Sequence, residues 1–202
     1  MRREASMFGV LMALLGLSGN AAAQEVPLGC SAPRDTRAFE AGLLSGRSLV
    51  QQAWNSVASC GNLERFSSVV METLQNVTLP PGSDDYVVCR TVGTLVGAVE
   101  QVDETWTLCA IACCDEGELV GWIMGKLYCD LSIALGGVRL TNFLVQRPMG
   151  FCGATAQACC RDTFQSVTPA YQGLFGSCRP YTQGRFRATW TQSRNSVCSY
   201  RQ

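Results

Sequence analysis

The chain has 202 residues, 47% of them hydrophobic, and its 16 basic and 16 acidic side chains cancel to no net charge at neutral pH. It contains no histidine. This absence excludes Ser-His-Asp and Cys-His nucleophilic catalysis and zinc sites built with histidine ligands. A neutral chain also does not predict nucleic-acid binding, which depends on a strongly basic domain.

The first 23 residues have the three parts of a cleavable export signal. An arginine pair follows Met1, an apolar stretch runs from Met7 to Leu17, and Ala21-Ala22-Ala23 supplies the small residues that signal peptidases accept. The apolar stretch is about half the roughly 20 residues that a membrane-spanning helix needs. We therefore expect residues 1–23 to be removed and residues 24–202 to form a single domain that is secreted or periplasmic.

Hydrophobic residues then recur at helical spacing. The pattern predicts an amphipathic helix from Thr36 to Val57 and a second helix that Asn62 caps and that extends to Leu74. The Pro80-Pro81-Gly82-Ser83 segment then predicts a loop, because prolines and glycine interrupt helices.

Four further helices are expected along the rest of the chain. Ser83 is the expected cap of the third helix, whose acidic first turn suits the positive end of the helix dipole. Charged residues interrupt the apolar stretch at 117–137, so no membrane-spanning helix is expected in the mature chain. The expected helices run from Asp84 to Val102, from Glu104 to Cys114, from Asp115 to the Gly136-Gly137 pair, and across Cys159 and Cys160.

A Gly-x-Leu-x-Gly pattern occurs three times, at residues 42–46, 93–97 and 117–121. Glycines four residues apart lie on one side of a helix and allow another backbone to approach closely. We interpret the pattern as a sign of close helix packing.

All twelve cysteines lie after the expected cleavage site, and an even number in an exported chain indicates disulfides. Their spacing lacks the paired C-x-x-C ligands typical of zinc sites, so neither a metal nor another cofactor is expected. The neighbours Cys113-Cys114 and Cys159-Cys160 should each reach different segments, because a bond between adjacent residues on a helix would be strained. The cysteines are Cys30, Cys60, Cys89, Cys109, Cys113, Cys114, Cys129, Cys152, Cys159, Cys160, Cys178 and Cys198.

The end of the chain differs in charge and in pattern. Residues 24–146 hold 7 basic and 14 acidic side chains, whereas residues 147–202 hold 7 basic and 1 acidic. Alternating side chains at 184–191, a turn, and residues 197–200 predict a small β-hairpin. Its arginines and aromatic residues are candidate contacts for an anionic ligand. These candidates are Arg185, Phe186, Arg187 and Trp190.

The expected fold is therefore mainly α, a disulfide-cross-linked helical bundle with a small C-terminal β-hairpin. The expected function is non-enzymatic binding or envelope structure, with an anionic envelope component or an acidic protein as partner. The same basic segment could instead pack against the acidic helical part of its own chain. A secreted toxin or lipid-handling protein is a further alternative.

A carboxylate-dependent hydrolase of cell-wall polysaccharide is the enzymatic alternative, because it needs only an acid and a base at a suitable separation. Its eligible residues are Glu72, Asp84, Asp85, Glu104, Glu116 and Glu118. If the host is eukaryotic, Asn76-Val77-Thr78 is the single glycosylation acceptor of the sequence.

Overall fold

A computed structural model describes residues 28–109, 113–134, 155–156, 158–164 and 166. This part of the chain is mainly helical, with no strand, so the expected mainly α fold is confirmed. The predicted hairpin lies outside the described residues. The elements are η1 (Leu28–Cys30), α1 (Pro33–Val57), η2 (Cys60–Asn62), α2 (Leu63–Gln75), α3 (Asp85–Cys109) and α4 (Cys113–Ala134), where η marks a short 3-10 helix.

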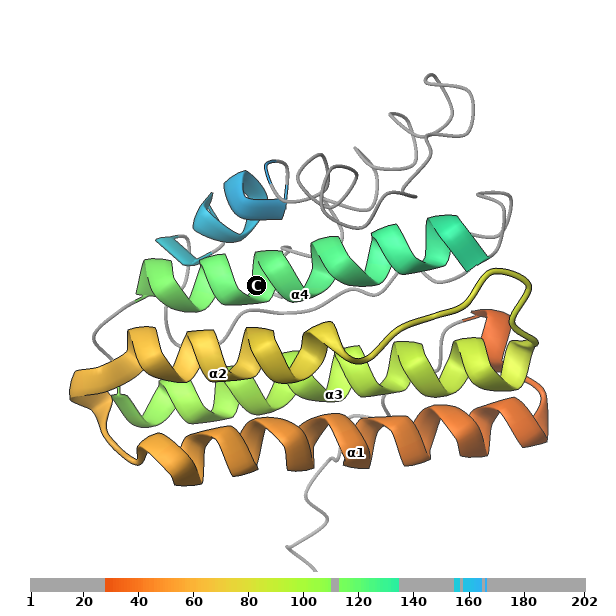
Figure 1. Cartoon of the computed structure of the whole chain (residues 1–202), viewed down its shortest axis with the longest axis horizontal. Helices are drawn as coiled ribbons and strands as arrows, with labels where there is room; N and C mark the ends of the chain where they lie inside the picture. Colours follow the sequence, from red (N-terminus) through yellow and green to blue (C-terminus); the bar gives the residue numbers. More distant parts are fainter. Residues whose placement is uncertain (1–27, 110–112, 135–154, 157, 165, 167–202) are drawn as a thin grey trace, which may run out of the picture.

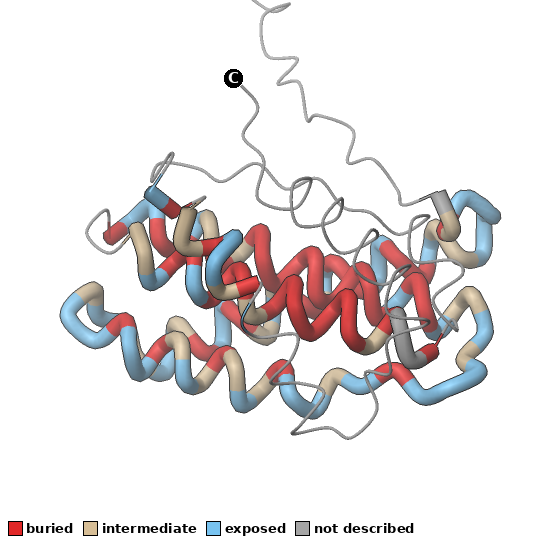
Figure 2. The backbone as a smooth tube through the Cα atoms, turned by 90° about the horizontal axis from the view of Figure 1, so that it is seen from above, coloured by how far each residue is buried: buried red, intermediate tan, exposed pale blue. Residues whose placement is uncertain are grey.

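The four long helices run alternately in opposite directions, so α1 and α3 are parallel (Figure 1). The contact between α1 and α3 is the most extensive between any two of these elements, and α3 also packs against α4. Ten consecutive residues of α3, 91–100, are all buried. Figure 2 shows such uninterrupted buried runs in the middle of the body, whereas other helical stretches alternate between buried and exposed. The core is therefore built around α3.

Glycines let α1 and α3 approach each other closely. A Cβ atom added to Gly42 would lie 2.2 Å from the Arg90 carbonyl oxygen, and one added to Gly46 would lie 1.9 Å from that of Thr94. The glycines of α3 are equally confined, since a Cβ on Gly93 or Gly97 would meet α1 carbonyl oxygens at 2.1 and 2.2 Å. Two of the three glycine patterns therefore form one helix crossing, as their spacing predicted.

The third glycine pattern, at residues 117–121 of α4, forms a second close contact. Residues 155–156, 158–164 and 166, which are helical, pack against α4. A Cβ on Gly117 would lie 2.3 Å from the Ala156 carbonyl oxygen, and one on Gly121 would lie 2.7 Å from that of Cys160. The expected helix around Cys159 and Cys160 is confirmed for these residues.

An aromatic cluster joins three helices. Phe66 of α2 is fully buried and lies between Trp54 of α1 and Trp106 of α3, with ring centroids 5.5 and 5.4 Å away. Such pairs add about 0.5 to 1.5 kcal/mol beyond the burial of their area. Asn62 directly precedes α2 as predicted, but its side chain makes no capping hydrogen bond.

The expectation of separate helices at 84–102 and 104–114 is wrong, because α3 continues without a break to Cys109. No glycine or proline interrupts it near Asp103, and the hydroxyls of Thr105 and Thr107 donate to carbonyl oxygens one turn earlier in the same helix. The buried side of α3 continues past this point, since Val102, Thr105 and Trp106 are all buried.

The expected cap of α3 is also corrected. The Ser83 hydroxyl donates to the Pro80 carbonyl oxygen at 2.7 Å and so closes the preceding turn. Asp84 takes the capping position instead, since its Oδ1 accepts the Val87 N–H at 2.9 Å. The cap lies one residue later than predicted.

Ala58 is strained at the end of α1. Its φ of 43° lies in the left-handed region, and no other non-glycine among the described residues has a positive φ. A residue with a Cβ atom loses about 1 to 2 kcal/mol in this conformation. Glycine avoids this loss, although it gives up more conformational entropy on folding. We expect Ala58→Gly to raise the free energy of unfolding by about 0.5 to 1 kcal/mol.

The matched control is Ala41→Gly in the exposed middle of α1, which should lower stability by about 0.5 to 1 kcal/mol. Urea unfolding of both variants measures the two effects. A loss of stability in Ala58→Gly would show that the left-handed turn is not strained.

Within the described part of the chain, no helix is both long enough and apolar enough to cross a membrane.

Candidate functional site

Three disulfides attach the two ends of α3 and the beginning of α4 to other segments. Cys30–Cys89 joins η1 to the beginning of α3, and Cys60–Cys109 joins η2 to its last residue. Cys114–Cys159 joins the first turn of α4 to the helical residues that pack against it. Cα atoms are 5.3 to 5.6 Å apart in these bridges, within the usual range. The prediction of disulfide bonds is confirmed here.

Neither pair of adjacent cysteines is bonded to itself. Because Cys114 binds Cys159, Cys113 and Cys160 must each bond elsewhere, and both are in disulfides. Cys129 is bonded as well, and none of the described cysteines is free. The remaining three, Cys152, Cys178 and Cys198, lie outside the described residues.

A buried ion pair lies within α4. Lys126 is the chain's one lysine, and its Nζ is 2.5 Å from Oδ2 of Asp130, one helical turn further on. Both side chains are largely removed from water, with exposed fractions of 4% and 13%. Burial raises the pKa of the Asp130 carboxyl, and the Lys126 ammonium opposes this rise only in part. The pair is therefore sensitive to loss of either partner.

A second ion pair connects α1 with α3 beside the glycine crossing. Arg47 donates from Nη2 and Nε to Oε2 of Glu100, at 2.7 and 3.1 Å. Glu100 is buried, and its hydrogen bond raises the pKa of the Arg47 guanidinium above its ordinary value. The bond satisfies an acidic group on the otherwise apolar middle of α3, so we assign it a structural role.

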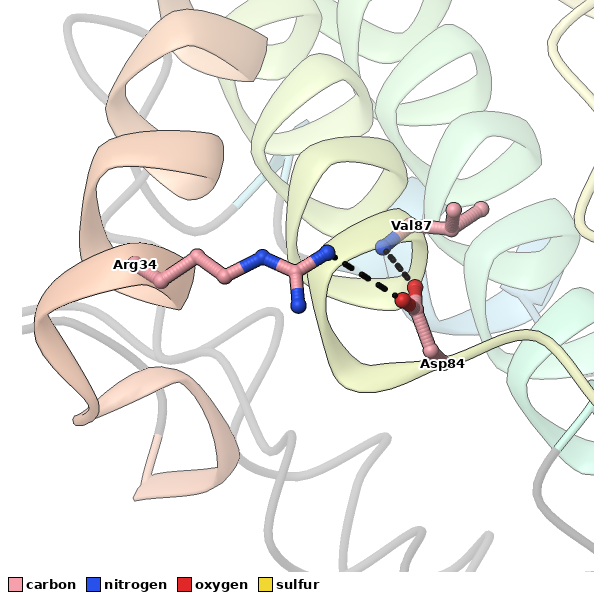
Figure 3. A network of polar contacts seen from close by, with 3 residues as sticks. All are labelled: Arg34, Asp84 and Val87. Carbon is pink, nitrogen blue, oxygen red and sulfur yellow. Dashed lines mark hydrogen bonds and ion pairs between the residues drawn. The ribbon is translucent and has the colours of Figure 1, made fainter.

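A polar network lies at the beginning of α3 (Figure 3). While Asp84 Oδ1 caps the helix through Val87, its Oδ2 lies 3.3 Å from Arg34 Nη2 of α1. The Arg34 guanidinium also lies 4.8 Å from the centre of the Tyr86 ring. Both charged side chains are more than half exposed, so this ion pair contributes little to stability.

The carboxylates that could serve a hydrolase are dispersed. Glu116 is buried and Glu118 is exposed, and two residues along a helix point to nearly opposite sides. These two residues therefore do not face one site together. Glu72 and Glu104 are exposed on α2 and α3, while Asp84 is used in the capping network. Asp85 is the first residue of α3.

Metal ligation has no candidate in the ranges that the structure describes. No three cysteine, aspartate or glutamate side chains there are grouped so that they could hold an ion. The described cysteine sulfurs are also committed to disulfides.

The predicted contacts for an anionic ligand, Arg185, Phe186, Arg187 and Trp190, lie outside the described residues. The helical body itself is acidic: residues 28–109 and 113–134 hold 6 basic and 13 acidic side chains. Seven of the acidic residues are exposed. They are Glu40, Glu64, Glu72, Asp84, Glu104, Asp115 and Glu118. The described helical body therefore carries an excess of negative charge.

The ion pair between Lys126 and Asp130 was not predicted from the sequence. Its signal was a lysine and an aspartate four residues apart within an apolar stretch, which is the spacing of an ion pair on one side of a helix. The same charges had been used only as an argument against a membrane-spanning helix.

Comparison with known proteins adds no functional assignment. No family model, no curated protein and no solved structure matches this chain. Charge distribution and disulfide placement are therefore the observations that bear on function.

Proposed function

We propose that residues 1–23 are cleaved during export and that residues 24–202 act outside the cytoplasm as a disulfide-linked, non-enzymatic binding or envelope protein. The basic segment 147–202 contacts an anionic envelope component or an acidic partner protein. The separation of charge between the acidic helical body and this basic segment is the observation that carries the proposal.

The cysteines support the export part of the proposal. Every described cysteine is in a disulfide, and the bridges Cys30–Cys89, Cys60–Cys109 and Cys114–Cys159 join residues 45 to 59 positions apart in the chain. Such bonds persist in oxidising compartments and are reduced in the cytosol. A fold whose helix ends depend on them is suited to a secreted or periplasmic protein.

Charge supports the binding part. The described helical body carries an excess of seven acidic side chains, 13 against 6, so anions are disfavoured over its surface. Residues 147–202 have the opposite excess, 7 basic against 1 acidic. Arginine donates two parallel hydrogen bonds to carboxylate or phosphate, and neighbouring aromatic rings add contact area. An anionic ligand is therefore expected to contact Arg185 and Arg187.

Binding of lipopolysaccharide and of alginate, an acidic polysaccharide, by the oxidised mature protein tests the proposal. Affinity should fall about tenfold between about 50 and 200 mM salt, because salt screens exposed charges. Arg185→Gln/Arg187→Gln should weaken binding by a similar factor at low salt. The matched control is Arg65→Gln/Arg90→Gln, which removes two exposed arginines from α2 and α3 and should leave affinity unchanged.

Binding that does not depend on salt, or that survives in Arg185→Gln/Arg187→Gln, contradicts the proposal. If the basic segment instead pairs with the acidic body of its own chain, the same double variant lowers the melting temperature at low salt. That result would identify the two arginines as structural.

A further inference from the structure

We infer that Asn76 is an acceptor for an N-linked glycan when the chain passes through a glycosylating secretory pathway. The inference rests on the export part of the proposed function, and it adds a modification site that the binding role does not require. Asn76-Val77-Thr78 is the single Asn-x-Ser/Thr tripeptide of the sequence.

The tripeptide lies where a glycan can be accommodated. α2 ends at Gln75, and both Asn76 and Thr78 are exposed. The Asn76 side-chain amide nitrogen donates to the Glu72 carbonyl oxygen over 3.4 Å, a long hydrogen bond that an attached sugar can replace at little cost. The residue that would be modified is already exposed to solvent.

The residues next to Asn76 and Thr78 hold the backbone in place, while the side chains of Asn76 and Thr78 stay exposed. The Val77 N–H donates to the Leu74 carbonyl oxygen at 3.0 Å and closes the end of α2. Leu79 is buried, with 4% exposure, and anchors the connection to the core. Pro80 then prevents the helix from continuing. Attachment at Asn76 would therefore displace no core side chain.

A glycan here would also leave the disulfides at the other end of α2 undisturbed. α2 has 13 residues, which corresponds to about 20 Å of helix. η2, with the Cys60–Cys109 bridge, directly precedes its first residue. Figure 1 shows the connection after α2 at the opposite end of the bundle from the turn between α1 and α2. The glycan would cover the exposed Pro80-Pro81-Gly82 turn instead.

The reaction needs one co-substrate, an oligosaccharide linked through diphosphate to a polyprenyl lipid. The Asn76 amide nitrogen forms a bond to C1 of the sugar, and the bond between C1 and the diphosphate oxygen breaks. The lipid diphosphate leaves and takes up the proton that the amide loses, so no oxidant or reductant is involved.

The test is secretion of the whole mature chain from yeast behind a yeast signal peptide, with intact mass measured before and after peptide-N-glycosidase F. We expect a mass above that of the polypeptide, and the enzyme should remove the excess and leave aspartate at position 76. Asn76→Gln and Thr78→Ala should abolish the excess, and Thr78→Ser should keep it. Asn55→Gln, an exposed helical asparagine outside any acceptor tripeptide, should have no effect.

Secreted wild-type chain at its unmodified mass, from cells that glycosylate a reporter protein, would overturn the inference. An excess that persists in Asn76→Gln would overturn it as well. Because the signal peptide is supplied, failure of the chain's own signal does not affect the result. Binding to anionic ligands is not measured, so failure of the proposed function remains distinguishable.

Discussion

Gly46→Ala should lower the free energy of unfolding by about 3 kcal/mol or more. The added Cβ would lie 1.9 Å from a backbone oxygen of α3, against 3.4 Å for ordinary contact, so the helices must separate by roughly 1.5 Å. No flexible side chain can move aside, because the nearest atoms belong to the Thr94 and Ala98 backbone. A gain in helix propensity of about 1 kcal/mol offsets only part of the loss.

Thermal unfolding under oxidising conditions measures this effect, and a loss of about 3 kcal/mol corresponds to about 6 to 12 °C for a domain of this size. Gly61→Ala is the matched control. A Cβ there would meet only the Ser59 hydroxyl, at 3.6 Å, so stability should change by less than about 0.5 kcal/mol. Equal melting temperatures for Gly46→Ala and wild type would contradict the close crossing of α1 and α3.

Lys126→Met should cost about 3 kcal/mol at neutral pH, because it leaves the Asp130 carboxylate without its cation in a largely buried position. Methionine keeps most of the apolar length of the lysine side chain, so the loss reports mainly on charge. With Lys126 absent, the pKa of Asp130 should rise further above its ordinary value of 3.8, since the ammonium group is what lowers it.

The sign of the pH dependence follows from that shift. An acid with a raised pKa in the folded state contributes stability that is fully present below its unfolded pKa and is lost as pH rises through the folded pKa. The deficit of Lys126→Met should therefore vanish near about pH 3 and grow toward neutrality. Urea unfolding of wild type and variant across this range measures it.

Two further variants make this prediction specific. Lys126→Met/Asp130→Asn should recover most of this loss at neutral pH, because it removes both buried charges with side chains of similar volume and leaves no unpaired charge. Arg34→Met breaks the exposed pair with Asp84 and should cost less than about 1 kcal/mol. A deficit of Lys126→Met that stays constant with pH would contradict the ionisation of Asp130.

Local patterns were enough to predict most helices. The apolar residues from Thr36 to Val57 recur every three or four positions, and α1 spans all of them. Residues Leu63 to Leu74 likewise lie within α2. Glycine spacing also predicted that α1, α3 and α4 each pack closely against another segment, because two glycines four residues apart lie on one side of a helix. The spacing alone could not predict that the pattern on α1 contacts the pattern on α3.

The continuity of α3 and the Lys126–Asp130 pair were harder to predict, because both depend on packing against other parts of the chain. The sequence predicted one helix up to Val102 and another from Glu104, but the burial of Val102 and Trp106 in the core accompanies a single unbroken helix. Lysine usually lies on the protein surface. The burial of Lys126 depends on the segments that pack around α4. The basic contacts at Arg185 and Arg187 stay a prediction, since they lie outside the described residues.

Disulfide mapping of the protein purified from its host's exported fraction tests the central claim most directly. Digestion without reduction, followed by mass spectrometry, should give a chain that lacks residues 1–23. Linked peptides should pair Cys30 with Cys89, Cys60 with Cys109, and Cys114 with Cys159. Free thiols at these positions, or a bond between Cys113 and Cys114, would contradict a helical body that disulfides hold together in an oxidising compartment.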